Sequence, residues 1–200
     1  MGASILYFLI VGDSPITILQ TQRLILRRWQ DSDRQPFAEI NADPRVMEFF
    51  PNTLTREQSD RVVDRIEAAF MQRGFGLCAV ERQSDRSFLG FIGLSVPNFE
   101  AHFTPCVEIG WRLASNSWGQ GFATEGASAI AAYAFETLKL DSLVSFTAEQ
   151  NLRSRRVMEK IGMTFDPADS FDHPNLPHGH LLRRHVLYRL RAAEFRQPVK

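Results

Sequence analysis

The stretch Trp118-Gly119-Gln120-Gly121-Phe122-Ala123-Thr124-Glu125 decides how this chain folds. It separates an apolar run with the alternation of a strand from an apolar run with helical spacing. Two glycines separated by one residue let the backbone turn tightly and approach a ligand closely. The first amides of the following helix then point at whatever anion lies there. The sequence therefore predicts a phosphate-binding turn.

Three other interpretations of this turn compete. A P-loop would close the turn with Lys followed by Ser or Thr, but Ala123 and Thr124 stand there. A dinucleotide-binding turn would have a third glycine or alanine where Thr124 is found, and an acidic residue ending the next strand, whereas Asp141 precedes that strand. A turn that only connects a strand to a helix stays open on this motif alone.

Composition and charge limit the class of protein. The chain has 200 residues, 44 % of them hydrophobic, which is enough for one sizeable core. Its 23 basic and 23 acidic residues cancel, so charge gives no reason to expect a nucleic-acid or membrane partner. Cys78 and Cys106 lack C-x-x-C spacing, which predicts neither a disulfide framework nor a zinc site and fits the reducing cytoplasm.

The apolar run from Ile5 to Val11 is much shorter than the about 20 residues that span a bilayer, and it lacks the basic start of a signal peptide. We expect residues 1–15 to form an extra strand or an apolar leader. Residues 16–191 would form one domain, and residues 192–200 a C-terminal tail.

The pattern of apolar residues predicts strands and helices in alternation. Thr55 and Gln58 have the spacing of a capping box, which predicts a helix start. The stretch after Asp31 is compatible with a helix. The remaining expected helices cover 55–72, 123–138 and 151–161, and the expected strands cover 16–29 (one bent or two short), 75–81, 88–96, 106–113, 143–148 and 182–190.

The run 106–113 has the alternation of a central strand. One set of side chains would point to one face, namely Val107, Ile109, Trp111 and Leu113. The other face would carry Cys106, Glu108, Gly110 and Arg112.

These residues resemble the GNAT acetyltransferase superfamily, in its branch related to the ribosomal-protein N-terminal acetyltransferases. In the family's cofactor motif, Gly121 and Ala123 fill the last two places, while Trp118 stands where Gln or Arg is usual. That departure leaves the phosphates to backbone amides. Three further segments resemble the family in the same order, namely Thr21–Arg27, Glu108–Trp111 and Asn151–Met163.

The resemblance implies an α/β (α+β) fold: a single domain whose mixed, mostly antiparallel central sheet is flanked by helices. It implies acetyl-CoA as the cofactor, bound between two splayed central strands. The residues implied for cofactor binding are Ile109, Gly110, Trp111, Gly119, Gln120, Gly121, Phe122, Ala123, Thr124 and Asn151.

The implied activity is N-acetyl transfer to a primary amine by direct attack in a ternary complex, so catalysis would depend strongly on positioning. The acceptor would be a small molecule or a protein N-terminus, and a homodimer is compatible with this activity. The rival class is a non-catalytic acyl-CoA-binding or scaffold protein on the same fold, which would need no proton-transfer residues.

Glu108 is the candidate general base, since a partly buried carboxylate has a raised pKa and can accept a proton. An ion pair with Arg112 on the same face is the competing interpretation. Asn151 and Ser154 share one side of a helix start, where Asn151 can serve simply as the N-cap. By resemblance, Asn151 would contact the pantetheine arm and Ser154 would protonate the leaving sulfur. Tyr188 is a rival donor that fits a core position better.

Two further groups carry weaker signals. Arg153, Arg155, Arg156 and Lys160 give one helix a basic surface, and one of them could meet the 3′-phosphate of the cofactor. His173, His178, His180 and His185 lie near Asp169 and Asp172, but their spacing matches no standard set of ligands, so we expect no metal. This segment is instead expected to form an ordered loop at the acceptor pocket.

Overall fold

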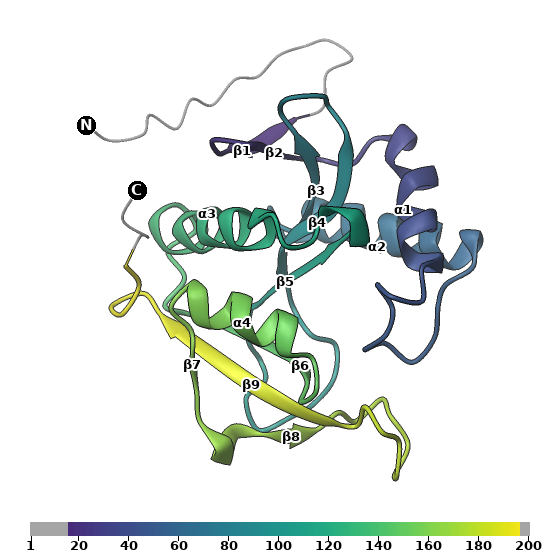
Figure 1. Ribbon diagram of the computed structural model, residues 1–200. Coiled ribbons are helices and arrows are strands. Elements are labelled where there is room, and N and C mark those ends of the chain that lie inside the picture. Colours follow the sequence, from purple (N-terminus) through teal and green to yellow (C-terminus); the bar gives the residue numbers. More distant parts are fainter. Residues whose placement is uncertain (1–15, 197–200) are drawn as a thin grey trace.

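The computed structural model describes residues 16–196, so the strand expected at 5–11 lies outside the described residues. In the described part, nine strands form one sheet in the order β1-β2-β3-β4-β5-β6-β9-β7, with β8 paired to β9 (Figure 1). The strands are β1 (Thr17–Gln20), β2 (Leu24–Arg27), β3 (Leu77–Arg82), β4 (Phe88–Ser95), β5 (Glu108–Leu113), β6 (Ser142–Ala148), β7 (Thr164–Phe165), β8 (Phe171–Asp172) and β9 (Arg184–Arg191). Every pairing is antiparallel except that of β5 with β6, which confirms the expected mixed sheet.

Four α-helices flank this sheet, namely α1 (Arg34–Ala42), α2 (Arg56–Arg73), α3 (Phe122–Glu136) and α4 (Leu152–Lys160). The predicted capping box begins α2: Thr55 Oγ1 accepts from the Gln58 amide, and Gln58 Oε1 accepts from the Thr55 amide. Gly74, at φ 77°, ends the same helix in the left-handed region. None of the helices from residue 16 to residue 196 is both long and apolar enough to cross a membrane.

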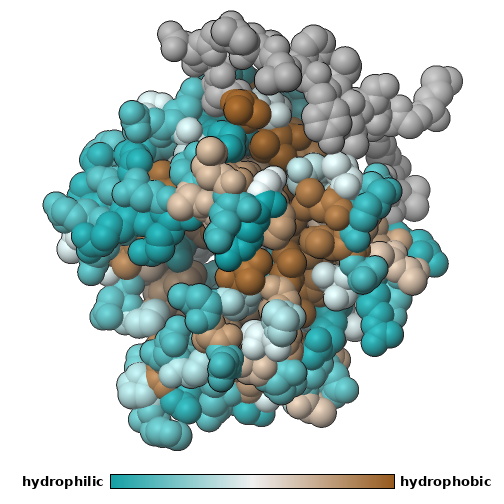
Figure 2. Space-filling view, turned by 180° about the vertical axis from the view of Figure 1, so that it is seen from behind, coloured by the Kyte–Doolittle hydropathy of each residue, from teal (hydrophilic) through white to brown (hydrophobic). Residues whose placement is uncertain are grey.

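Helices cover both faces of the sheet. Phe91 and Ile92 are neighbours on β4 and therefore point to opposite faces. The ring of Phe91 meets Phe37 of α1, with centroids 5.9 Å apart, whereas Ile92 packs against Gly126 of α3. The main core is continuous across these layers, and partly buried apolar residues extend it toward the surface. Seen from behind, an apolar band crosses the middle of the molecule between polar margins (Figure 2).

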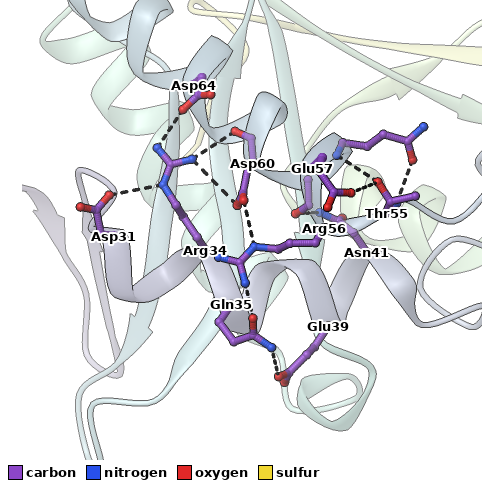
Figure 3. Close-up of polar contacts among 12 residues, drawn as sticks. Asp31, Arg34, Gln35, Glu39, Asn41, Thr55, Arg56, Glu57, Asp60 and Asp64 are labelled. Carbon is purple, nitrogen blue, oxygen red and sulfur yellow. Dashed lines mark hydrogen bonds and ion pairs between the residues drawn. The ribbon is translucent and has the colours of Figure 1, made fainter.

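Polar contacts join α1 to α2 (Figure 3). Arg34 of α1 donates to Asp64 of α2 at 2.8 Å, and Arg56 of α2 donates to Gln35 of α1. These contacts fix the two helices against each other, and with them the loop that connects α1 to α2.

The two central strands part from each other. β5 and β6 are parallel, with one registered pair, Glu108 with Val144, and the Val144 amide donates to the Val107 carbonyl at 3.0 Å. β6 pairs along its whole length with β9 on its other edge, but after Val144 it has no further registered pair with β5. The strands therefore open a gap toward their C-terminal ends, as the resemblance implied.

Most boundaries differ from the expected ones by one or two residues. β5 begins at Glu108 rather than 106, and β9 begins at Arg184 rather than 182. The sequence did not predict β7 and β8, because a two-residue strand is too short to show alternation.

A buried ion network sets a testable requirement for stability. Arg27 is 3 % exposed and donates to Asp33 at 2.7 and 2.8 Å and to Glu81 at 2.9 Å. Arg27→Ala would leave both carboxylates buried without this cation, so we expect the free energy of unfolding to fall by about 3–5 kcal/mol. The exposed Arg45, which pairs with Asp43, supplies the control, since an ion pair open to solvent contributes little and Arg45→Ala should destabilise far less than Arg27→Ala. Urea denaturation measures both, and equal losses would contradict the prediction.

Candidate active site

A cavity of about 740 Å³ lies where β5 and β6 part. Strands β4, β5 and β6, the start of α3, one side of α4 and the α1–α2 loop line it. Most of the candidate residues meet in its wall, namely Glu108, Gly110, Trp111, Gly119, Gly121, Ala123, Thr124, Asn151 and Ser154. Residues from four separate elements therefore converge on one space.

The glycine turn forms one end of this cavity. Gly119 and Gly121 have φ of 74° and 81°, a region that side-chain-bearing residues avoid. Gly121 is the N-cap of α3, and Ala123 and Thr124 of the first turn line the cavity. The unpaired amides and the positive end of a 15-residue helix therefore face the cavity, which suits an anion.

Hydrogen bonds from the β1–β2 turn hold the glycine turn on the side that does not line the cavity. The Glu125 carboxylate accepts from Thr21 Oγ1 at 2.6 Å, from the Arg23 amide at 2.9 Å and from Arg23 Nε at 2.6 Å. Although burial opposes it, these hydrogen bonds lower the pKa of Glu125. Arg23 also donates to the Gln120 carbonyl at 2.9 Å and stacks on Phe122. Glu125 thus lies in the first turn of α3, where a negative charge is favourable, and ties the start of that helix to the β1–β2 turn.

Three residues of the predicted cofactor set place their side chains elsewhere. Ile109 is fully buried in the core, because it points to the α3 face of β5. Phe122 is also buried, and Gln120 folds back to donate to the Asn116 carbonyl at 3.0 Å. Only the backbone of these residues is left to face a ligand.

Glu108 reaches into the cavity from β5. Ser95 Oγ donates to its carboxylate at 3.0 Å from the neighbouring strand β4. Burial raises the pKa of Glu108 to about 7, and the hydrogen bond from Ser95 opposes that rise. The alternative pair with Arg112 does not form, since Arg112 donates to Asn41 Oδ1 at 2.6 Å instead. Glu108 is therefore poised to exchange a proton near neutral pH.

Asn151 and Ser154 lie together at the start of α4. The Asn151 side chain accepts from the Ser154 amide at 3.2 Å, so it is an N-cap. Its amide also donates to Thr147 Oγ1 at 2.9 Å and to Ser154 Oγ at 3.1 Å. No described residue accepts from the Ser154 hydroxyl, which leaves its proton for a group in the cavity.

Tyr188 occupies a core position, as its place on an alternating strand suggested. It is 1 % exposed, and its hydroxyl donates to Glu159 at 3.0 Å and accepts from Arg155 at 3.3 Å. Arg155 is therefore engaged outside the cavity. Arg153, Arg156 and Lys160 of the same helix line it.

The other end of the cavity is aromatic. Phe146, His173 and His185 line it, and Phe99, Phe103 and Phe171 pack behind them. Burial lowers the pKa of His185 to about 4 and also lowers that of His173, so both imidazoles are neutral at pH 7. Across residues 16–196, no three His, Cys, Asp or Glu side chains gather as metal ligands would.

Sequence reasoning missed the α1–α2 loop and the partners of the candidate residues. Val46, Phe49, Phe50 and Pro51 of this loop line the cavity, although nothing in their spacing marks them. Ser95 and Thr147 could have been suspected only by knowing which strands are neighbours. Trp118 lines the cavity as well, with its ring N–H donating to the Leu113 carbonyl at 2.9 Å.

Residues 23–164 match the model of the acetyltransferase (GNAT) domain. The chain belongs to the GNAT acetyltransferase family. It is similar to the uncharacterised N-acetyltransferase YnaD of Bacillus subtilis, with 30 % identity over 72 % of this chain and 81 % of the relative. This GNAT chain is therefore an acyl-CoA-dependent acetyltransferase.

Solved structures agree with this assignment. An acetyltransferase from Agrobacterium tumefaciens has 30 % identity and a TM-score of 0.71, covering 94 % of this chain and 99 % of its own. RimL, a ribosomal L7/L12 α-N-protein acetyltransferase solved with coenzyme A, has a TM-score of 0.69 over 88 % of this chain and 97 % of its own. Its identity is 15 %, so it shows a shared fold alone.

The Ser95 hydrogen bond makes a prediction about the Glu108 carboxyl. Ser95→Ala removes a donor to the charged form, so we expect the pKa of Glu108 to rise above about 7. A carbon-detected NMR titration of the Glu108 carboxyl measures this. Ser145→Ala is the control, since Ser145 lines the same cavity without bonding Glu108. An unchanged or lower pKa in Ser95→Ala would contradict the prediction.

Proposed function

We propose that this acetyltransferase transfers an acetyl group from acetyl-CoA to a primary amine of a small molecule or a protein N-terminus. Amine and thioester would meet in one ternary complex. The observation that carries the proposal is that one cavity is lined by the start of a helix, by a carboxyl with a pKa of about 7 and by a hydroxyl whose proton no described residue accepts. These are the groups that such a transfer needs.

The cavity fits the cofactor at its phosphate end. Gly119 and Gly121 present bare backbone there, with no side chain between the amides and a pyrophosphate. A Cβ on Gly119 would meet nothing within 4 Å, so the space over the turn is open. The pantetheine arm would run along the unpaired backbone edge of β5 beside Gly110 and Trp111 toward Asn151, which leaves the face of the strand free for the acceptor. The acetyl group would then lie where β5 and β6 separate, beside Glu108.

Two basic residues of α4 suit the 3′-phosphate. Arg156 and Lys160 are four residues apart, so they lie on one side of the helix, and both line the cavity. Neither forms an ion pair with a described carboxylate. Arg153 already has protein partners, because it donates to Glu48 at 2.5 Å and stacks on the Trp118 ring at 4.6 Å. We therefore assign the phosphate to Arg156 and Lys160.

The proposed reaction begins with a neutral amine beside Glu108. The amine nitrogen attacks the thioester carbonyl, and Glu108 takes the proton that the nitrogen loses, directly or through a water. As the C–S bond breaks, the Ser154 hydroxyl passes its proton to the departing sulfur while taking one from a solvent water, so that the hydroxyl is restored and coenzyme A leaves as the thiol. Asn151 and Thr147 orient that hydroxyl by the hydrogen bonds described above. Holding both reactants in this geometry supplies much of the rate.

The alternative is a protein that binds acyl-CoA without turnover. Such a protein has no need for a carboxyl whose pKa is near 7 and which a neighbouring serine orients. The Ser95–Glu108 hydrogen bond therefore favours an enzyme.

Coenzyme A should stabilise this protein, because a ligand that binds only the folded state raises stability by mass action. Gly121→Val would strain the backbone at φ 81° and bring its Cβ within 3.4 Å of Arg23 Nη2, so it should distort the turn and abolish the rise in Tm with coenzyme A. Gly74→Val is a matched control, since Gly74 has φ of 77° and lies outside the cavity. Both variants should lose stability from backbone strain, but only Gly74→Val should still respond to the ligand. A normal response by Gly121→Val would make the turn a mere connector.

Variants of the two proposed proton-transfer residues, Glu108 and Ser154, should lose activity to extents that depend differently on pH. Below pH 7 the wild-type Glu108 is protonated and cannot act as a base, so the deficit of Glu108→Gln should be small there. Above pH 7 it should grow to roughly 100-fold or more. Ser154→Ala should lose less activity than Glu108→Gln. Its loss should appear in kcat more than in the affinity for coenzyme A, because the variant removes an interaction made in the transition state.

Single-turnover rates from pH 6 to 9 measure these deficits. The exposed Glu100, outside the cavity lining, gives the control variant Glu100→Gln, which should match the wild type throughout. Equal deficits of Glu108→Gln and Ser154→Ala that do not change with pH would mean that neither residue moves a proton.

A further inference from the structure

Arg112 of β5 lines the cavity without an acidic partner. Its Nη1 donates to the uncharged Asn41 at 2.6 Å, and its Nε is buried with no hydrogen-bond partner. Burial lowers the pKa of Arg112 to about 10, so the side chain remains charged at neutral pH. The residue is half-buried, and a cation that is partly removed from water without a counter-charge is costly, so a bound anion would stabilise it.

The guanidinium is held in a fixed place. It lies over the ring of Phe50 at 4.2 Å and 5.5 Å from the ring of Phe91. Asn41, at the end of α1, is fully buried and donates to Ser59 of α2 at 2.8 Å (Figure 3 shows its place between the helices). The α1–α2 pair therefore orients Asn41, and Asn41 orients the guanidinium. A pre-oriented guanidinium is well suited to carboxylate, which it can bind through two parallel N–H donors.

Glu108, Gly110 and Arg112 lie on one face of β5, because side chains alternate along a strand. A Cβ on Gly110 would meet only Glu108 Oε1, at 3.8 Å, so the strand between the two charged residues has an open surface. Their Cα atoms are four residues apart, which is roughly 13 Å along an extended strand. An extended molecule can lie along this surface with one end at each residue.

We propose that Arg112 binds a carboxylate of the acceptor, and that the acceptor is an extended amine with its carboxylate several bonds from the amino group. This rests on the proposed function, in which the amino group lies beside Glu108. A free α-amino acid is too short to reach both residues. An ω-amino acid or a short peptide with a carboxylate has the required length.

The test uses a series of straight-chain ω-amino acids of increasing length, each compared with its own ω-amino amide. The full chain is assayed for acetylation by thiol release, and binding to the coenzyme A complex is followed in parallel by thermal shift. We expect each acid of sufficient length to exceed its amide by roughly 10- to 100-fold in kcat/KM. The shortest members should show little difference between acid and amide.

The variant Arg112→Gln should remove the preference for acids while leaving the affinity for coenzyme A within about twofold, and Arg112→Lys should restore part of it. Arg82→Gln is the control. Arg82 also comes from a strand of the sheet but is paired with Asp85 outside the cavity, so its variant should keep the full preference.

Two results would overturn the proposal while sparing the proposed function. In one, the wild type acetylates amines with no preference for acids, and no acid gives a larger thermal shift than its amide. In the other, Arg112→Gln loses coenzyme A affinity and keeps the preference, which would assign Arg112 to the cofactor. Failure of the proposed function itself looks different, because the protein would then neither bind coenzyme A nor acetylate any amine.

Discussion

The site depends on a backbone constraint: β5 and β6 are paired at Glu108 and Val144 and part beyond that point. A fully paired parallel ladder would satisfy the β5 backbone and leave no room between the strands. β6 stays in the sheet because its other edge pairs along its length with β9, whereas its edge toward β5 is left unpaired beyond this point, like the facing edge of β5. The unpaired edge of β5 is thus available to a ligand, and Glu108 stands where the opening begins.

Two charged clusters keep this opening in shape from outside it. Arg27, Asp33 and Glu81 join β2, β3 and the entry to α1, while Arg23 and Glu125 join the β1–β2 turn to the start of α3. Neither cluster lines the cavity. Their common effect is that the sheet, the glycine turn and α1 are held relative to one another by groups that a ligand does not touch, so the cavity is largely pre-formed.

The sequence was most informative where a signal is local. The capping box of Thr55 and Gln58, the glycine turn and the alternation around Glu108 each involve a few consecutive residues, and the structure has each of them in place. The partners of the site residues could not be predicted in the same way. Asn41 and Arg112 are 71 positions apart, and only the packing of α1 over β4 brings them together. The α1–α2 loop has no periodicity, so its place in the cavity follows from tertiary structure alone.

The aromatic end of the cavity also affects how this enzyme can be studied. At that end His173 and His185 have the ordinary pKa values closest to neutrality, and burial lowers both, that of His185 to about 4. Both imidazoles are therefore uncharged at pH 7 and above, so their charge does not change on the alkaline side of neutrality. A change in rate between pH 7 and pH 9 must then come from groups other than these two imidazoles.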